Sequence, residues 1–216
     1  IRGVGIGKTS FKRRINSGLA VGFSFLKTAF ENSNFIFNQI DIANRYTNDI
    51  VLQHERSIYT DVIKAIDIES NELIDFTTTM HSSKDSYAIS KRDRPLAYII
   101  KKNNYGFIDK LDDVGVNYVE FEKDTMIYSG SYKVVEFNNN FKVYEKMKMQ
   151  KVVTSIEYSN NKFSKGDIIV SMNQKRSNLI AELLEPEAPN SYVSFGIIKT
   201  SLNKQLPIYR IKNFNN

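Results

Sequence analysis

Apolar and polar positions alternate differently in the two parts of the chain. Two apolar stripes with spacings of three and four run along residues 17–31: Leu19, Phe23, Leu26 and Phe30 in one, and Val21, Phe25 and Ala29 in the other. This spacing predicts a helix over 17–31, after a glycine-rich strand end and loop over 1–15. Two stripes on one helix indicate that it is buried on several sides. A second helix is predicted over 34–46.

Beyond about residue 61 the period changes to two, and β-branched and aromatic residues become frequent. This pattern predicts strands, which we place at 62–68, 72–79, 87–90, 96–100, 116–121, 127–137, 152–158, 167–171 and 206–211. Helices are predicted over 105–114, with Gly115 as the left-handed residue after it, and over 175–184, where Pro186 ends it. Polar clusters predict turns at Asn71, 82–85, 138–140 and 160–161. The chain is therefore predicted to be α+β, with a boundary near residues 48–61.

The amino-acid composition excludes several classes of function. The chain has 216 residues, no cysteine and two histidines. Disulfides, iron–sulfur clusters and thiol catalysis are thereby excluded, and neither His54 nor His81 has the partner that a zinc-binding helix needs. No apolar run reaches the roughly 20 residues of a membrane helix, so no membrane span is predicted.

The net charge of +6 comes entirely from the start of the chain. Residues 1–30 contain no acidic residue and six basic ones: Arg2, Lys8, Lys12, Arg13, Arg14 and Lys27. The rest of the chain has 24 basic and 24 acidic residues. Such a segment attracts anions, and it fits either a solvated face or a site for a carboxylate-bearing substrate. A nucleic-acid interface ranks lowest, because no known module accompanies the charge.

Other local patterns carry little chemistry. The segment GVGIGKT at 3–9 ends like a phosphate-binding loop, but Arg2 occupies the position of its first glycine. No Ser–His–Asp set is recognisable. Glu182, Glu185 and Glu187, around Pro186, are predicted to be surface or loop residues.

Two parts of the chain resemble the zinc carboxypeptidase (M14-like) family, in the bacterial type that carries an accessory C-terminal domain. In that family the catalytic glutamate is followed by an apolar residue and an arginine, which Ile1 and Arg2 match at the head of IRGVGIGKTSFKRRINSGLAVGFSFL. The C-terminal similarity lies in RPLAYII at 94–100 and in KGDIIVSMNQKRSNLIAELLEPEAP at 165–189.

The resemblance implies that residues 1–50 are the helical remnant of an α/β peptidase domain and that 51–216 form a mixed α/β accessory domain rich in strands. In the family, zinc held by an H-x-x-E pair and a later histidine activates water, and the glutamate is the general base. All of these residues would precede Ile1, so this chain is expected to lack catalytic and metal-binding residues and to be inactive alone. Zinc is expected in a full-length parent.

The resemblance also suggests partners and a substrate-binding role. The upstream catalytic portion of the same protein and a peptide with a free C-terminus are the expected partners. Arg2, Lys8, Arg13 and Arg14 are the candidate substrate-binding residues, because arginine pairs with carboxylates through two hydrogen bonds. An extracytoplasmic bacterial location is slightly favoured.

Two roles remain open for the second part of the chain. The accessory domain would shape or cover the substrate cleft. Alternatively, the chain is a non-catalytic binding module for peptide or cell-wall glycan, whose ligand would lie on the aromatic strand 128–137; these aromatics would otherwise fill the core.

Overall fold

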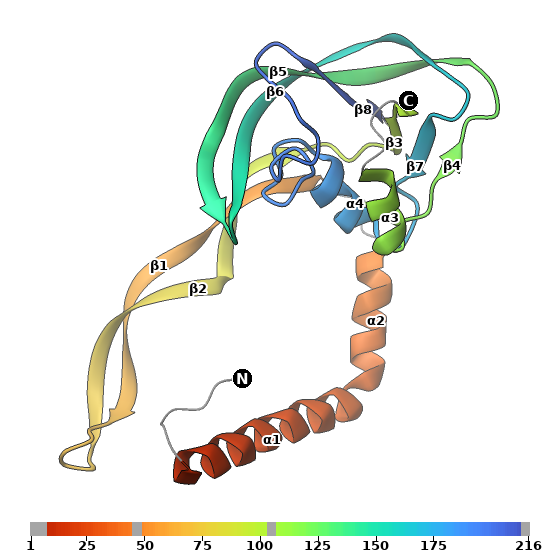
Figure 1. Ribbon diagram of the computed structural model, residues 1–216. Helices are drawn as coiled ribbons and strands as arrows, with labels where there is room; N and C mark the ends of the chain where they lie inside the picture. Colours follow the sequence, from red (N-terminus) through yellow and green to blue (C-terminus); the bar gives the residue numbers. More distant parts are fainter. Residues whose placement is uncertain (1–7, 45–48, 103–106, 213–216) are drawn as a thin grey trace. The chain divides into compact units, whose positions relative to one another are not determined.

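A computed structural model describes residues 8–44, 49–102 and 107–212 (Figure 1). The chain divides into two compact units, Ile1–Tyr46 (unit 1) and Thr47–Asn216 (unit 2). Unit 1 is helical and unit 2 is dominated by antiparallel sheets. The predicted α+β class, with helices before a strand-rich region, is confirmed.

The described residues of unit 1 form two helices, α1 (Lys8–Glu31) and α2 (Ser33–Asn44). Asn32 lies between the two helices. Its backbone N–H and its side-chain amide both donate to the carbonyl of Thr28 in α1, at 3.1 and 2.8 Å. The predicted loop is wrong from Lys8 onward, where the structure is already helical. Lysine and arginine are good helix formers, so the cationic stretch extends the helix instead of preceding it.

Unit 2 begins with a two-stranded antiparallel ribbon of β1 (Ile50–Ile66) and β2 (Leu73–Arg92). Asn71 turns the chain with a positive φ of 58°. The break predicted at 82–85 is wrong, because β2 runs through it. Ser57 pairs with Ser82 and Glu55 with Tyr87, so the extra residues of β2 form a bulge and do not reverse the chain.

The main sheet has six antiparallel strands in the order β4-β7-β3-β8-β5-β6. Its strands are β3 (Ala97–Ile100), β4 (Val119–Glu120), β5 (Thr125–Tyr144), β6 (Met147–Phe163), β7 (Ile168–Ser171) and β8 (Gln205–Ile211). The loops predicted at 138–140 and 160–161 lie inside β5 and β6. The hairpin turns instead at Glu145 and Lys146, whose positive φ values of 47° and 70° suit a tight two-residue turn.

Two short helices, α3 (Ile108–Asp113) and α4 (Ser177–Leu184), supply apolar side chains to the core of unit 2. Leu111 of α3 and Ile180 and Leu184 of α4 are fully buried. Gly115 follows α3 with a φ of 66°, as its predicted role requires. Pro186 ends α4 as predicted, and the residue between them, Glu185, caps the helix in an extended conformation.

Candidate functional site

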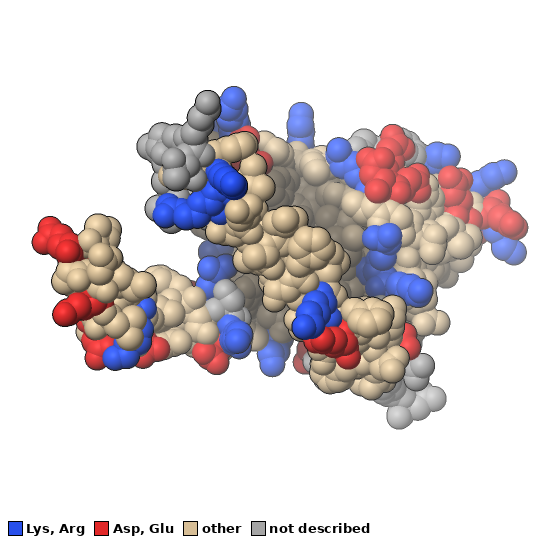
Figure 2. Space-filling view, turned by 90° about the horizontal axis from the view of Figure 1, so that it is seen from below, with Lys and Arg blue, Asp and Glu red and all other residues tan. Residues whose placement is uncertain are grey.

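The cationic segment predicted to bind a carboxylate lies partly on α1. Arg13 and Arg14 are exposed on the first half of the helix, separated by about 100° around its axis. Arg2 lies outside the described residues, and so does the side chain of Lys8. Figure 2 shows basic residues at one end of the helix. The structure therefore places two of the four candidates together, on one turn of α1.

Both helices of unit 1 also present large apolar side chains on their surfaces. On one stripe of α1, Phe23, Leu26 and Phe30 are 64%, 68% and 82% exposed. On α2, Phe35 and Phe37 are exposed to a similar degree. The predicted stripes are present, but within unit 1 the two helices do not bury them. Exposed apolar area of this extent marks an interaction surface.

A buried carboxylate in unit 2, that of Glu185, lies at the centre of a network of hydrogen bonds and ion pairs. Glu185 has no exposed surface. Its Oε1 accepts hydrogen bonds from the hydroxyls of Tyr98 (2.6 Å) and Tyr132 (2.9 Å), and its Oε2 accepts one from Nη1 of Arg92 at 2.6 Å. Glu185 lies in the loop that follows α4, one of the two settings predicted for it, but it is not on the surface, because its position at the end of α4 directs it into the core.

Arg92 holds a second carboxylate with the other arm of its guanidinium. Its Nη2 donates to Oε1 of Glu187 at 3.2 Å. The same oxygen accepts from the backbone N–H and the hydroxyl of Thr154, both at 2.7 Å. The last residue of the ribbon is thus tied to two carboxylates that flank Pro186.

The ionisation of this network follows from burial and charge together. Burial is the largest single influence on Arg92 and opposes its positive charge, but the charge and hydrogen bond of Glu185, with the smaller effects of Tyr132 and Glu187, together outweigh burial and raise the pKa of Arg92. For the phenols of Tyr98 and Tyr132, burial and then the charge of Glu185 raise the pKa well above the usual 10.0. The cluster therefore holds Arg92 as a cation and both phenols as neutral donors near neutral pH.

A second buried arginine, Arg210 on β8, anchors the residue that follows the ribbon. It donates to the carbonyl of Asp93, and its Nη1 lies 3.4 Å from a carboxylate oxygen of the same residue. Arg92 is thus held by two glutamates and Asp93 by an arginine, at the point where the ribbon leaves the core. The two networks fix Arg92 and Asp93, which we call the ribbon base, to α4, β3, β5 and β8.

A cavity of about 260 Å³ opens beside this base. It is lined by β1, β2, the tip of the β5–β6 hairpin and the loop after α4; the residues include His54, Ile89, Phe141, Lys151, Glu187 and Pro189. The ammonium groups of Lys142 and Lys151 lie 5.7 and 5.3 Å from the ring centre of Phe141. The cavity therefore has an apolar wall at Phe141, with basic lysines and the acidic Glu187 beside it. Such a cavity can receive a small amphipathic group.

The described residues offer no metal cage and no membrane helix. No group of three or more His, Cys, Asp or Glu side chains in the described ranges lies close enough to hold a metal ion. Over the same ranges, no helix is both long and apolar enough to cross a membrane.

Comparison with known proteins links the whole chain to carboxypeptidases. The chain is 31% identical to a protein named carboxypeptidase 2 from Trichophyton equinum over 220 residues, which cover 98% of this chain and 40% of that protein. Carboxypeptidase 2 from Trichophyton rubrum is 30% identical over the same shares. A probable carboxypeptidase 2 from Arthroderma benhamiae is 29% identical over 193 residues, 85% of this chain and 36% of that protein.

The chain therefore spans about two fifths of the length of the curated relatives that it matches. It is distantly homologous to a portion of fungal carboxypeptidase 2 proteins. No family model matches the chain, and no solved structure matches it. The predicted relation to carboxypeptidases is confirmed at this level; the assignment to the zinc-dependent M14-like family and to its bacterial type stays a prediction.

Proposed function

We propose that this chain is the C-terminal part of a zinc metallocarboxypeptidase-like protein, and that unit 2 is an accessory domain that shapes or covers the substrate cleft. The observation that carries the proposal is the similarity to carboxypeptidase 2 over 98% of the chain, which includes both units. Both units would then belong to one peptidase architecture rather than to an unrelated binding module.

Unit 1 would contribute to the catalytic domain of the parent. Its exposed apolar stripes would pack against the catalytic portion, which is the partner expected from the sequence. Arg13 and Arg14, together with Arg2 and Lys8, would then supply a positive field for the terminal carboxylate of a peptide substrate. The complete absence of acidic residues before Glu31 supports this role.

Unit 2 would act through its ribbon. An isolated two-stranded ribbon is only marginally stable in water, but the base of this one is fixed by Arg92 to two carboxylates. A rigidly anchored ribbon can restrict which peptides reach a neighbouring cleft. The cavity at its base would then receive a part of the peptide away from the scissile bond.

Zinc does not fit the described residues of this chain, which bring no suitable ligand group together. The zinc of the proposed family would lie in the remainder of the parent.

The decisive experiment uses the complete gene product that contains this chain. It should release the last residue from a peptide with a free C-terminus but not from the same peptide with a C-terminal amide. A chelator should abolish the release, and zinc should restore it. Failure to hydrolyse a panel of peptides with apolar, basic and acidic last residues would overturn the peptidase assignment.

A pair of charge reversals tests the role of the cationic turn in that protein. Arg13→Glu and Arg14→Glu should each raise KM for the free-carboxylate peptide by about 10-fold, which corresponds to the loss of one charged contact. Lys27→Glu is the matched control, since it lies on the same helix about 20 Å further along and is exposed. An equal effect of all three reversals, or an unchanged KM with an intact fold, would remove the idea.

The alternative is a non-catalytic module that binds peptide or cell-wall glycan, and the cavity beside Phe141 is the observation that favours it. The aromatic strand itself is divided, because Tyr132 is buried and Tyr128 is 47% exposed. A complete gene product that binds such a polymer without hydrolysing any peptide would favour this alternative.

A further inference from the structure

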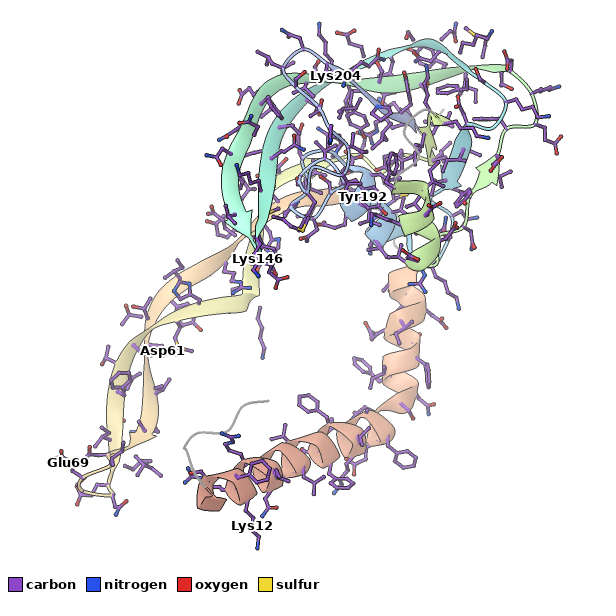
Figure 3. All side chains as sticks on the ribbon, viewed as in Figure 1. Lys12, Asp61, Glu69, Lys146, Tyr192 and Lys204 are labelled. Carbon is purple, nitrogen blue, oxygen red and sulfur yellow. The ribbon has the colours of Figure 1, made fainter. Side chains whose placement is uncertain are left out.

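Three lysines line a second cavity of unit 2, on the side of the sheet where β3 ends and β8 begins. The cavity has a volume of about 200 Å³. Its lining consists of Lys101, Lys199, Lys204, Gln205, Leu206, Pro207 and Tyr209. Lys204 is labelled in Figure 3, where it lies far from Lys146 at the tip of the β5–β6 hairpin. This cavity is separate from the ribbon base and has no part in the proposed function.

Backbone hydrogen bonds hold the lysine-bearing segments in place. The N–H of Lys101 donates to the carbonyl of Pro207 at 3.0 Å. The loop before β8 is fixed to β5, because Val134 donates to the carbonyl of Lys204 at 3.0 Å and accepts from Asn203 at 2.9 Å. The walls of the cavity are therefore set by the sheet rather than by a free loop.

An aromatic pair positions one of the three ammonium groups. Nζ of Lys101 lies 5.0 Å from the ring centre of Tyr209 and 5.6 Å from that of Phe163. The two rings meet edge to face at 5.0 Å, and both are buried. Cation–π attraction keeps the ammonium group of Lys101 over these two rings. A positive charge therefore stays at the cavity without a carboxylate to hold it.

The charge in this cavity is uncompensated by its surroundings. Three lysines elsewhere in the described residues form ion pairs with acids: Lys162 with Asp124 at 3.0 Å, Lys64 with Asp75, and Lys27 with Glu31. The lining of the lysine cavity contains no acidic side chain. Within the described ranges, none of its three lysines forms an ion pair. Three like charges around one small space repel one another, and an anion between them relieves that repulsion.

We propose that this cavity is an oxyanion site that binds a phosphate or carboxylate group. Three ammonium groups supply up to nine hydrogen-bond donors, whereas the lining has no carboxylate that would repel the ligand. Leu206, Pro207 and Tyr209 add apolar surface to the lining. The site goes beyond the peptidase proposal, and its occupancy is measured independently of any hydrolysis.

The test is equilibrium dialysis of the full 216-residue chain against radiolabelled inorganic phosphate, with total ionic strength held constant by chloride. The wild-type chain should bind phosphate in competition with chloride. The double variant Lys199→Gln/Lys204→Gln should bind at least about 10-fold more weakly, and Lys101→Gln should also weaken binding. The double variant Lys146→Gln/Lys148→Gln is the control, because it removes the same charge at the hairpin tip; its affinity should stay within about 2-fold.

A second probe distinguishes a free ion from an anionic group on a polymer. If the natural ligand is polymeric, an amidated hexaglutamate peptide should bind more tightly than phosphate and should displace it. If the ligand is a free ion, phosphate should bind more tightly than the peptide. Far-UV circular dichroism should show the same fold for every variant. Absence of phosphate and peptide binding in the wild-type chain, or equal losses in the cavity and hairpin-tip variants, would overturn the proposal.

Discussion

Arg92 and Glu185 form the central ion pair of unit 2, with Nη1 at 2.6 Å from Oε2 and no exposed surface on the glutamate. The pair joins the last residue of the ribbon to the residue that caps α4. A carboxylate at the C-terminal end of a helix is opposed by the helix dipole. Arg92 and two tyrosine hydroxyls offset that cost. The buried carboxylate of Glu185 is therefore a main contributor to the stability of the ribbon base.

Replacing Glu185 by alanine should destabilise unit 2 strongly. Glu185→Ala leaves a buried guanidinium without its main counter-charge, which costs about 3–5 kcal/mol of unfolding free energy. Glu182→Ala is the control, because that half-exposed carboxylate on α4 only accepts bonds from Asn190 and its loss should cost less than about 1 kcal/mol.

Urea unfolding followed by near-ultraviolet circular dichroism measures this effect, since eleven of the twelve tyrosines lie in unit 2. Equal midpoints for the Glu185 and Glu182 variants would show that the ion pair contributes nothing to stability.

The hydroxyl of Tyr132 should be worth more than that of an exposed tyrosine with the same kind of partner. Tyr132→Phe removes a buried hydrogen bond to a charged oxygen, which is worth about 1.5–3 kcal/mol. Tyr87→Phe removes an exposed bond of the same length, 2.9 Å, to Glu55 and should change stability by less than about 0.5 kcal/mol. Chemical denaturation of the two variants gives the comparison; similar losses would contradict it.

Unit 2 should lose stability at high pH through its buried phenols. Tyr98 and Tyr132 have a pKa well above 10.0 in the folded chain, whereas the unfolded chain releases these protons near pH 10. Their contribution is therefore fully present below pH 10 and is lost as the pH rises from 10 through the raised pKa.

An absorbance titration at 295 nm checks this prediction. Tyr192 should ionise with a pKa of about 12 because of its burial, and Tyr98 and Tyr132 should ionise only when the fold opens. The double variant Tyr98→Phe/Tyr132→Phe should lack this last phase. One common transition of all tyrosines near pH 10 would rule out the buried network.

Two glycines should respond in opposite directions to alanine. Gly115 has a positive φ of 66°, and an added Cβ would lie 3.1 Å from the guanidinium of Arg176. Gly115→Ala should therefore destabilise unit 2 by about 1 kcal/mol or more. Gly22 lies inside α1 with nothing within 4 Å of an added Cβ, so Gly22→Ala should favour the helix by up to about 1 kcal/mol.

Thermal unfolding should show the loss at Gly115, and far-ultraviolet circular dichroism should show the gain in helix at Gly22. A stabilising Gly115→Ala would mean that the left-handed turn after α3 does not form.

Local patterns predicted the short elements of unit 2 well. The predicted strand at 96–100 corresponds to β3, that at 167–171 to β7, and that at 206–211 to β8, while the predicted helix at 175–184 contains α4. Each of these elements is short and bounded by a residue that acts locally, such as Pro186. The physical signal for such an element lies within the element itself.

The long hairpins were predicted only in pieces, because their continuity comes from pairing. Asn138 pairs with Lys151 across the β5–β6 hairpin, and Asn161 pairs with Ile127. Asparagine favours turns when a strand has no partner, but the backbone hydrogen bonds of a long antiparallel neighbour outweigh that preference. The Ser82 cluster became a bulge of β2 for the same reason.

The sequence by itself determined the α+β order, the acid-free cationic start with Arg13 and Arg14, and the absence of cysteine chemistry, because these depend on residue type and on near neighbours along the chain. Only the tertiary structure decided that Glu185 is buried against Arg92, 93 positions away, and that Lys101 lines one cavity with Lys199 and Lys204. Burial and the meeting of distant charges arise when strands pair and pack, so they have no signature in any single stretch of sequence.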